Sequence, residues 1–422
     1  MSLPTAGPPR SSAEDARRRQ AVTLLLVLAM GFALAVRINI SPFLMDRVVS
    51  YTGEGGAVYE KLHFGSYLIF LMLPLALMAQ PFRLSGEEIG KFRALFWYMV
   101  LLSAMVVLFV AVGRAGSVVF VVDSYLVAAA AGLALLAMGP DARRALGHFV
   151  LVMLIVSALI GIGEAATEKR LLPYNLVELT FRPLGLSEHP LALGALCATA
   201  IGFVPLAHWR LWVRVLAIFV LFVGCAASGA RFALLLAAAE ILVLLVALPW
   251  PGLSRRHMRM AKFAVLVMCL AGGALLTAIL AAGGFLTRFG ATIFDENFYA
   301  RVTVNQAFGL VGWQQLLFGM PPADLLALVN DRLGLPFIES AQVVIGLTFG
   351  IPLALVFAGL TGWIVLRLLA GAPLAAWIGT AVTVLAALSN NTLSAKQPVV
   401  TVLFVLLLGF AGRAHRARRP EG

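Results

Sequence analysis

The hydrophobic positions along this chain form long uninterrupted runs that are separated by polar segments. Most runs are about 20 residues long, which is the length of α-helix that crosses the hydrocarbon core of a bilayer. The pattern therefore predicts an all-α polytopic integral membrane protein with about twelve transmembrane helices. We place these helices near residues 21–40, 64–82, 94–113, 116–138, 147–165, 189–207, 211–227, 231–249, 262–283, 340–366, 373–388 and 398–412.

Three connections between the predicted helices are much longer than the others. Each follows an odd-numbered helix, so all three lie on one side of the membrane, at roughly residues 41–63, 166–188 and 284–339. We expect function to concentrate in such loops. The largest loop, between the ninth and tenth helices, carries apolar residues at helical spacing on both sides of Pro321 and Pro322. This spacing predicts two short helices that lie on the membrane surface.

Basic residues indicate the orientation of the predicted bundle. The net charge is +12, but 61% of the residues are hydrophobic and only 12% are charged, so the charge does not point to a nucleic-acid partner. Of the 32 Lys and Arg residues, 20 lie in the tails and shorter connections on one side, and 12 lie on the side with the long loops. Because positively charged loops stay in the cytoplasm, we expect both termini to be cytoplasmic and the long loops to lie outside.

The chain is predicted to be one transmembrane unit with two short tails. The first apolar run is too long for a signal-peptide core, so we interpret it as a retained first helix. The expected parts are a cytoplasmic N-terminal tail (1–20), a single transmembrane domain (21–412) that includes the loop 284–339, and a basic cytoplasmic tail (413–422). The three cysteines lie inside apolar runs without metal-ligand spacing, so we expect neither a metal site nor a cofactor.

Several arginines are predicted to lie at the outer surface. Arg231 follows a tight turn at Ser228 and Gly229, and it is joined outside by Arg182, Arg288 and Arg301. A guanidinium group is always charged and presents a planar fork of donors, which suits pairs of phosphate oxygens. Arginines that converge here would bind a diphosphate. Alternatively, each could extend to lipid headgroups or pair with a nearby carboxylate.

Three other ionisable residues are candidates for a role inside or near the bundle. Glu240 lies near mid-membrane, where it is either protonated or hydrogen-bonded in a packed interior, or lines a polar path. His189 precedes Pro190, an arrangement typical of a helix start, where capping is the ordinary role. Glu339, followed by Ser340 at the outer mouth of the tenth helix, could cap that helix or interact with its dipole.

Four stretches also resemble parts of a known family. Its small-residue helix after an outer loop is similar to GLSEHPLALGALCATA (185–200), and its Ser-Gly-Arg turn before an apolar helix is similar to SGARFALLLA (228–237). Its arginine-bearing helix resembles RVTVNQAFGLVGWQQLLFGM (301–320), and its helix after a catalytic-loop residue resembles ESAQVVIGLTFGIPLALV (339–356). In these stretches, and in the predicted topology, the chain resembles the O-antigen ligase and O-antigen polymerase superfamily of bacterial envelope glycosyltransferases.

The resemblance implies a membrane glycosyltransferase of the bacterial inner membrane. Such an enzyme takes a glycan from undecaprenyl diphosphate at the periplasmic face and transfers it to a hydroxyl of an acceptor glycan. Arg231, Arg301, Arg288 and Arg182 would then bind the diphosphate, with no metal required. Glu339 is the first candidate for the base that accepts the hydroxyl proton, and His189 is the second. Membrane lipids and other polysaccharide assembly proteins are the expected partners.

One departure from the family pattern affects the choice of acceptor. O-antigen ligases usually carry histidine followed by asparagine where this chain has Glu339 and Ser340, which favours a polysaccharide polymerase over a ligase that transfers to lipid A core. A lipid-linked oligosaccharide flippase would also have many helices, outer cations and an intramembrane carboxylate. However, transporters often show internal repeats, and we find none here. A scaffold for other envelope enzymes is a third alternative.

Overall fold

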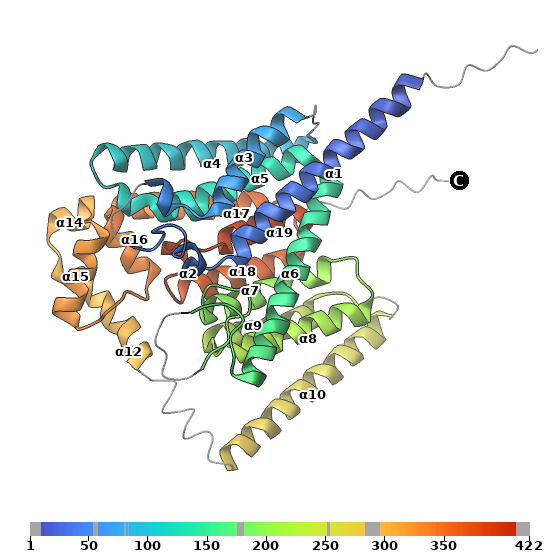
Figure 1. The fold of residues 1–422 in the computed structure, drawn as a ribbon. Coiled ribbons are helices and arrows are strands. Elements are labelled where there is room, and N and C mark those ends of the chain that lie inside the picture. Colours follow the sequence, from blue (N-terminus) through green and yellow to red (C-terminus); the bar gives the residue numbers. More distant parts are fainter. Residues whose placement is uncertain are drawn as a thin grey trace, which may run out of the picture.

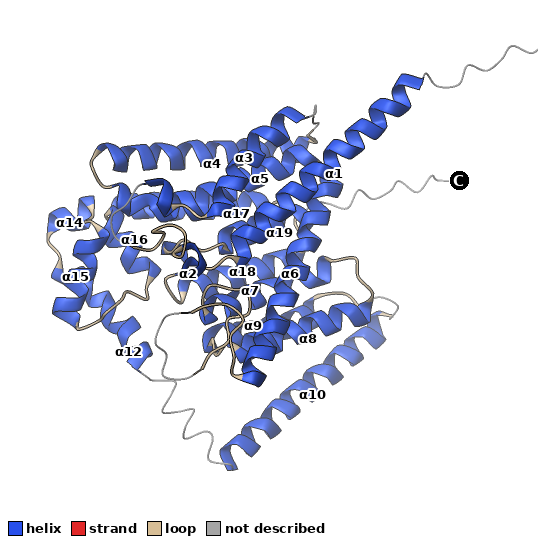
Figure 2. Ribbon diagram, viewed as in Figure 1, coloured by secondary structure: helices blue, strands red, loops and turns tan. Residues whose placement is uncertain are grey.

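The structure is a computed structural model that describes residues 10–53, 58–79, 82, 84–174, 181–250, 254–282 and 296–410. Within these residues every regular element is a helix and no strand occurs (Figure 2). The all-α prediction is therefore confirmed for the described part of the chain.

The helices follow the order of the apolar runs, and most form one closely packed bundle (Figure 1). The bundle contains α1 (Arg10–Asn39), α3 (Phe64–Ala79), α4 (Gly86–Ala111), α5 (Val127–Met138), α6 (Pro140–Thr167), α7 (Pro190–Phe203), α8 (Leu211–Ala227), α9 (Arg231–Ala247), α17 (Ile351–Leu369), α18 (Leu374–Leu388) and α19 (Val399–Phe410). A 3-10 turn, η2 (Ala115–Val118), and a π-helical turn, η3 (Val121–Leu126), lead into α5, while α10 (Arg255–Ala282) lies at the periphery against α9.

Length and composition make several of these helices fit to cross a membrane. Within the described residues, the five long and apolar stretches are Glu14–Asn39, Gly86–Ala111, Ala115–Met138, Pro140–Thr167 and Ile351–Leu369. Shorter apolar helices are Phe64–Ala79, Pro190–Leu206, Leu211–Ala227, Leu374–Leu388 and Val399–Phe410. This architecture is that of a polytopic membrane protein. The total of twelve spans and the orientation of the termini stay predictions.

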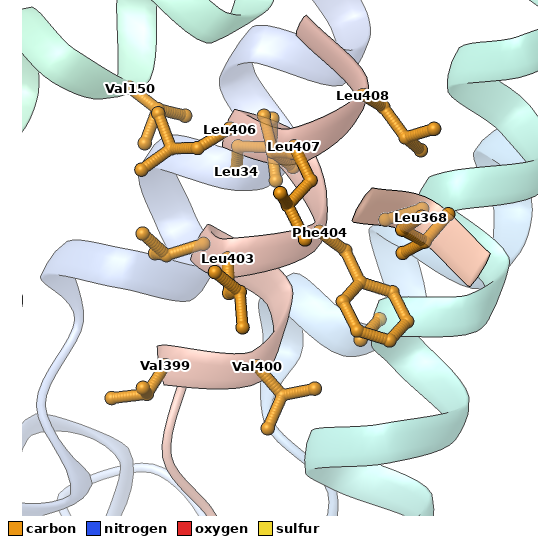
Figure 3. Close-up of a cluster of buried hydrophobic side chains, with 14 of the residues drawn as sticks. Leu34, Val150, Leu368, Val399, Val400, Leu403, Phe404, Leu406, Leu407 and Leu408 are labelled. Carbon is orange, nitrogen blue, oxygen red and sulfur yellow. The ribbon is translucent and has the colours of Figure 1, made fainter. Parts of the chain in front are cut away.

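The interior of the bundle is built around α19 and α5. Every residue of α5 is buried, and in α19 only Gly409 is not, as expected for helices that are apolar on all sides. Figure 3 shows the side chains of α19 among Leu34 of α1, Val150 of α6 and Leu368 of α17. Lipid tails are as apolar as these side chains, so close packing, and not removal from water, stabilises this centre.

The tenth predicted helix, 340–366, is in fact two helices. α16 (Ala341–Phe349) ends at Gly350, whose φ of +82° is rarely adopted by L-residues, and α17 begins with Pro352 in its first turn. A single continuous helix was therefore the wrong prediction, because the apolar composition continues across the break and conceals it. Glu339 consequently precedes the short α16 and does not lie at the mouth of the long helix α17.

Two backbone segments cross at Gly350. The crossing segment contains Gly319 (φ +72°), and a Cβ added to either glycine would lie 2.3 Å from a carbonyl oxygen of the other segment. Arg114, which connects α4 to η2, donates from Nη1 to the Phe318 carbonyl and from Nη2 to the Thr348 carbonyl. One guanidinium group therefore joins both segments at the crossing.

The largest predicted loop contains several short helices next to α16, which lie together at one edge of the molecule (Figure 1). They are α12 (Glu296–Thr303), α13 (Ala307–Leu310), α14 (Trp313–Phe318) and α15 (Pro322–Leu333). The second predicted loop helix is confirmed as α15, whereas the first is divided, with Gly312 at the N-terminus of α14. Val304, Leu325, Val329 and Val343 form a small core that attaches these helices to α16.

Candidate functional site

Two of the predicted diphosphate-binding arginines are placed at the turn before α9. Arg231 is the first residue of α9 and is exposed. Arg182 Nε donates to the Ser228 carbonyl at 3.2 Å, and the same nitrogen would lie 3.2 Å from a Cβ added to Gly229. Arg170 Nη2 donates to the Arg182 carbonyl at 3.0 Å. The structure thus brings Arg182 to the turn that precedes Arg231, with part of its guanidinium bonded to the backbone.

Two more of the predicted site residues, Arg301 and Glu339, form an ion pair. Arg301 of α12 donates from Nε to Glu339 Oε2 at 2.9 Å, and both side chains are partly exposed. Ser340 is the N-cap of α16, because its Oγ accepts from the Val343 amide. Glu339 is therefore not the helix cap, and its charge is balanced by Arg301. Arg288 lies outside the described residues.

His189 caps a helix. Its Nδ1 accepts from the Leu191 amide at 3.1 Å at the N-terminus of α7, so the capping interpretation is confirmed. Burial and the charges of Arg182 and Arg170 lower the pKa of His189 to about 4, which keeps the ring neutral and Nδ1 available as an acceptor. Since the cap occupies Nδ1, only Nε2 could act as a base.

The described parts of the connection between α6 and α7 are anchored by a buried carboxylate near the end of α6. Glu164 accepts from the backbone amides of Leu171 at 2.7 Å, Leu184 at 2.9 Å and Gly185 at 2.8 Å. Hydrogen bonds from backbone amides to a carboxylate are among the stronger ones in proteins. Glu164 therefore determines where the segment 181–189, which carries Arg182 and His189, lies over the bundle.

Glu240 is enclosed at a tight helix crossing. Its side chain is buried and neither carboxyl oxygen has a hydrogen-bond partner. A Cβ added to Gly202 of α7 would lie 2.4 Å from Glu240 Oε1 and 2.3 Å from the backbone of Gly379 in α18. This packing favours the first alternative for Glu240, a residue in a packed interior, over a residue that lines a polar path.

Asp123, which was not among the site residues predicted from the sequence, is the centre of a buried polar cluster. Its Oδ2 accepts from the Tyr51 hydroxyl at 2.6 Å, and its Oδ1 accepts from Ser66 Oγ at 2.5 Å and from the His63 amide at 3.0 Å. The Arg37 guanidinium lies 3.8 Å from Oδ2, and both side chains are fully buried. We call Asp123, Arg37, Tyr51, Ser66 and His63 the Asp123 cluster.

The backbone around Asp123 explains how the cluster forms. Asp123 lies in the π-helical turn η3, where the wider turn interrupts the α-helical ladder, and such turns are frequent at functional sites. Arg37 Nη2 donates to the Asp123 carbonyl at 2.9 Å and to the Lys396 carbonyl at 3.1 Å. Lys396 Nζ donates to the Tyr51 carbonyl at 2.7 Å and lies 4.0 Å from the Tyr51 ring centroid. The cluster thereby joins α1, η3, the connection between α1 and α3, and the segment before α19.

A cavity of about 360 Å³ lies next to the cluster, and Tyr51 and Lys396 are among the residues that line it. Its lining comes from parts of the chain that are far apart in sequence, from the connection between α1 and α3 to the segment before α19. The lining residues are Pro42, Tyr51, Thr52, Gly116, Ser117, Val119, Phe120, Glu188, Pro322, Val344, Thr348, Ser394, Ala395 and Lys396. Of the predicted site residues that the structure describes, Glu339, His189, Arg231, Arg301 and Arg182, none lines it, although Glu188 is the chain neighbour of His189.

The electrostatics of the cavity follow from the charges around it. Burial raises the pKa of Glu188 to about 7, a shift that Arg37 reduces and Asp123 increases. Burial also lowers the pKa of Lys396, and burial together with Asp123 raises the pKa of the Tyr51 phenol. Tyr51 therefore stays protonated and donates to Asp123, whereas Glu188 changes charge near neutral pH.

A signal for this site was present in the sequence. Asp123 is the only charged residue in the predicted helix 116–138, and Arg37 stands near the end of the first apolar run. Charged residues inside membrane helices face a partner or a cavity because lipid cannot solvate them. Their pairing required two helices to be placed side by side, which spacing along one chain cannot do.

Comparison with known proteins does not place the chain in a family: no protein-family model matches it, and no curated protein matches it significantly in sequence. The geometry and chemistry of the residues described above are thus what support a function.

Proposed function

We propose that the protein is a polysaccharide polymerase that transfers a glycan from undecaprenyl diphosphate to a hydroxyl of an acceptor glycan at the periplasmic face of the bacterial inner membrane. The observation that carries the proposal is the Arg301–Glu339 pair. These residues are 38 positions apart, and they place a guanidinium fork and a carboxylate 2.9 Å from each other in the outer-loop region.

The two partners would have separate roles in the transfer. The acceptor oxygen forms a bond to the anomeric carbon while the bond from that carbon to the diphosphate oxygen breaks. Glu339 takes the hydroxyl proton, and Arg301 stabilises the negative charge that develops on the leaving diphosphate. A bound diphosphate competes with Glu339 for Arg301 and so releases the carboxylate to act as a base.

Arg231 and Arg182 supply a second cationic position at the turn before α9. They would bind the same diphosphate or its lipid-proximal phosphate, with Arg231 the better candidate because it is exposed. A ligase that transfers to lipid A core would use the same groups. We favour the polymerase because Glu339 stands where the related ligases carry histidine.

The proposal is tested with purified protein in liposomes that contain a lipid-linked repeat unit. Glu339→Gln keeps the hydrogen bond to Arg301 but removes the proton acceptor, so polymer formation should fall about a hundredfold or more. Arg301→Lys should retain little activity, because an ammonium group lacks the planar fork of donors. Arg332→Lys on α15 changes an exposed arginine in the same loop and serves as the matched control.

Two results would contradict this function. Polymer yield close to wild type in Glu339→Gln would remove Glu339 as the base. Transbilayer movement of the lipid-linked glycan without any new glycosidic bond would instead identify a flippase. Membrane yield and a monodisperse elution profile for each variant show whether a loss of activity reflects chemistry or misfolding.

A further inference from the structure

Two buried hydroxyl groups in the cavity wall lack hydrogen-bond partners. Ser117 Oγ and Thr348 Oγ1 both belong to side chains that are 1% exposed, and neither has a partner in the described protein. A buried hydroxyl without a partner costs about 1–3 kcal/mol, so natural structures rarely keep one without a ligand or an ordered water. Both residues line the same cavity, although they come from η2 and α16.

The charged groups of the cavity are one acid and one base. Glu188 contributes a carboxylate that makes no hydrogen bond or ion pair to any described residue, whereas two donors of Lys396 are already bonded to the Tyr51 and Lys61 carbonyls. A carboxylate without a partner repels anions and accepts hydrogen bonds from hydroxyls. The opposite charge of Lys396 disfavours a cationic ligand. The cavity therefore suits a neutral ligand with several hydroxyl groups.

The rest of the lining is apolar and partly aromatic. Phe120, Val119, Pro322 and Val344 form walls around the polar groups. Sites for small molecules combine apolar walls with a few fixed polar groups, and this volume lies within their usual range. A sugar ring presents the matching surface, because its hydroxyls project from the rim while its C–H faces are apolar.

We propose that this cavity binds one ring of a neutral glycan, with the ring hydroxyls on Ser117, Thr348 and Glu188. Its assignment to the acceptor glycan rests on the proposed function, whereas the binding of a sugar ring does not. The Asp123 cluster acts as the floor of the site, since it holds Tyr51 and Lys396 in place from below.

The geometry makes this a subsite separate from Glu339. Glu339 and Thr348 stand at opposite ends of α16, which corresponds to roughly 13 Å at the rise of an α-helix. That separation exceeds one hydrogen bond but is comparable with the length of a short oligosaccharide. The cavity would therefore position a ring of the acceptor that is not the reacting one.

Direct binding tests the site without an activity assay. The full chain in lipid nanodiscs is titrated with oligosaccharides released by mild acid hydrolysis from the cell-surface polysaccharide of the producing organism, and binding is followed by equilibrium dialysis. Thr348→Val keeps the side-chain shape and removes the hydroxyl, so the dissociation constant should rise about three- to tenfold. At pH 8, where Glu188 is ionised, Glu188→Gln should raise it about tenfold or more, because hydrogen bonds to charged groups are stronger.

Thr401→Val is the matched control. Thr401 Oγ1 of α19 is also buried without a partner, but it does not line the cavity. Unchanged binding in Thr401→Val, together with weakened binding in Thr348→Val and Glu188→Gln, supports the site. Equal affinity in all three variants, or no saturable binding to the wild type, overturns it.

A separate readout distinguishes failure of the site from failure of the proposed function. Oligosaccharide binding that depends on Thr348 and Glu188 in a protein that forms no polymer would retain the sugar site and reject the polymerase. Polymer formation that is insensitive to both substitutions, in a protein that binds no free oligosaccharide, would retain the polymerase and reject the sugar site. Mass spectrometry can detect phospholipid that stays bound to the purified protein. Phospholipid bound to the wild type and lost in Ser117→Phe would show that the cavity binds a lipid headgroup, and would also overturn the sugar site.

Discussion

Replacing Asp123 by Asn tests how strongly the bundle depends on a charge in its interior. Asparagine keeps the shape of the side chain. Its amide oxygen can still accept from Ser66 and the His63 amide, and its amino group can donate to the Tyr51 oxygen. The main loss is the negative charge next to Arg37, which is 1% exposed. Removing one partner of a buried ion pair typically costs about 3–5 kcal/mol, because the other charge is left uncompensated.

The purified variant in detergent is compared with wild type by its unfolding half-life at a fixed temperature, which is followed by tryptophan fluorescence. If the pair is broken in the unfolding transition state, 3–5 kcal/mol shortens the half-life by about a hundredfold or more. Asp141→Asn is the control, since its pair with Arg144 is 3.8 Å long and Asp141 is 97% exposed, so less than about 1 kcal/mol is at stake. Arg37→Met in the Asp123→Asn background should restore part of the half-life. A half-life for Asp123→Asn within twofold of that for Asp141→Asn would refute the reasoning.

Three further predictions follow from other parts of the molecule. Gly350→Ala should lower the apparent unfolding temperature by several degrees, because the φ of residue 350 is positive and the added Cβ would meet a backbone oxygen. Gly362→Ala is the control: position 362 has open space around it, so this change should be neutral or slightly stabilising. Oligosaccharide binding should strengthen about fivefold from pH 6 to pH 8, because Glu188 has a pKa of about 7 and becomes ionised over this range. The charged and titratable groups around Glu188 are Arg37, Asp123, Lys396 and Tyr51. Glu188→Gln should bind the oligosaccharide equally at both pH values. A cysteine in place of Leu310, which is 44% exposed, should react with an impermeant thiol reagent added from the periplasmic side, and labelling only after the inner membrane is broken would reverse the predicted topology.

The sequence was sufficient for the features that depend on neighbouring residues. Apolar runs located the long helices, and the His-Pro pair at 189–190 indicated the start of α7 that the structure confirms. Pro321 and Pro322 likewise indicated the break before α15. These signals act within a few residues, where backbone preference and periodicity decide the outcome.

Features that depend on tertiary packing could not be predicted in the same way. The Arg301–Glu339 pair requires α12 to lie beside the start of α16, and the Asp123 cluster requires the segment around Tyr51 to pack against η3. The break at Gly350 was missed for a related reason: nothing in a local apolar pattern shows that another backbone segment, at Gly319, passes so closely.

The two hydrogen bonds from Arg114 to the crossing backbone segments have a consequence for the order in which the helices assemble during synthesis. Arg114 is synthesised 204 residues before Phe318 and 234 before Thr348, the two carbonyls that its guanidinium group joins. The donor is thus in place long before either acceptor leaves the ribosome, and the crossing can close only when the second segment arrives. We therefore expect α14 and α16 to take their final positions late in biogenesis, after the N-terminal helices have been inserted.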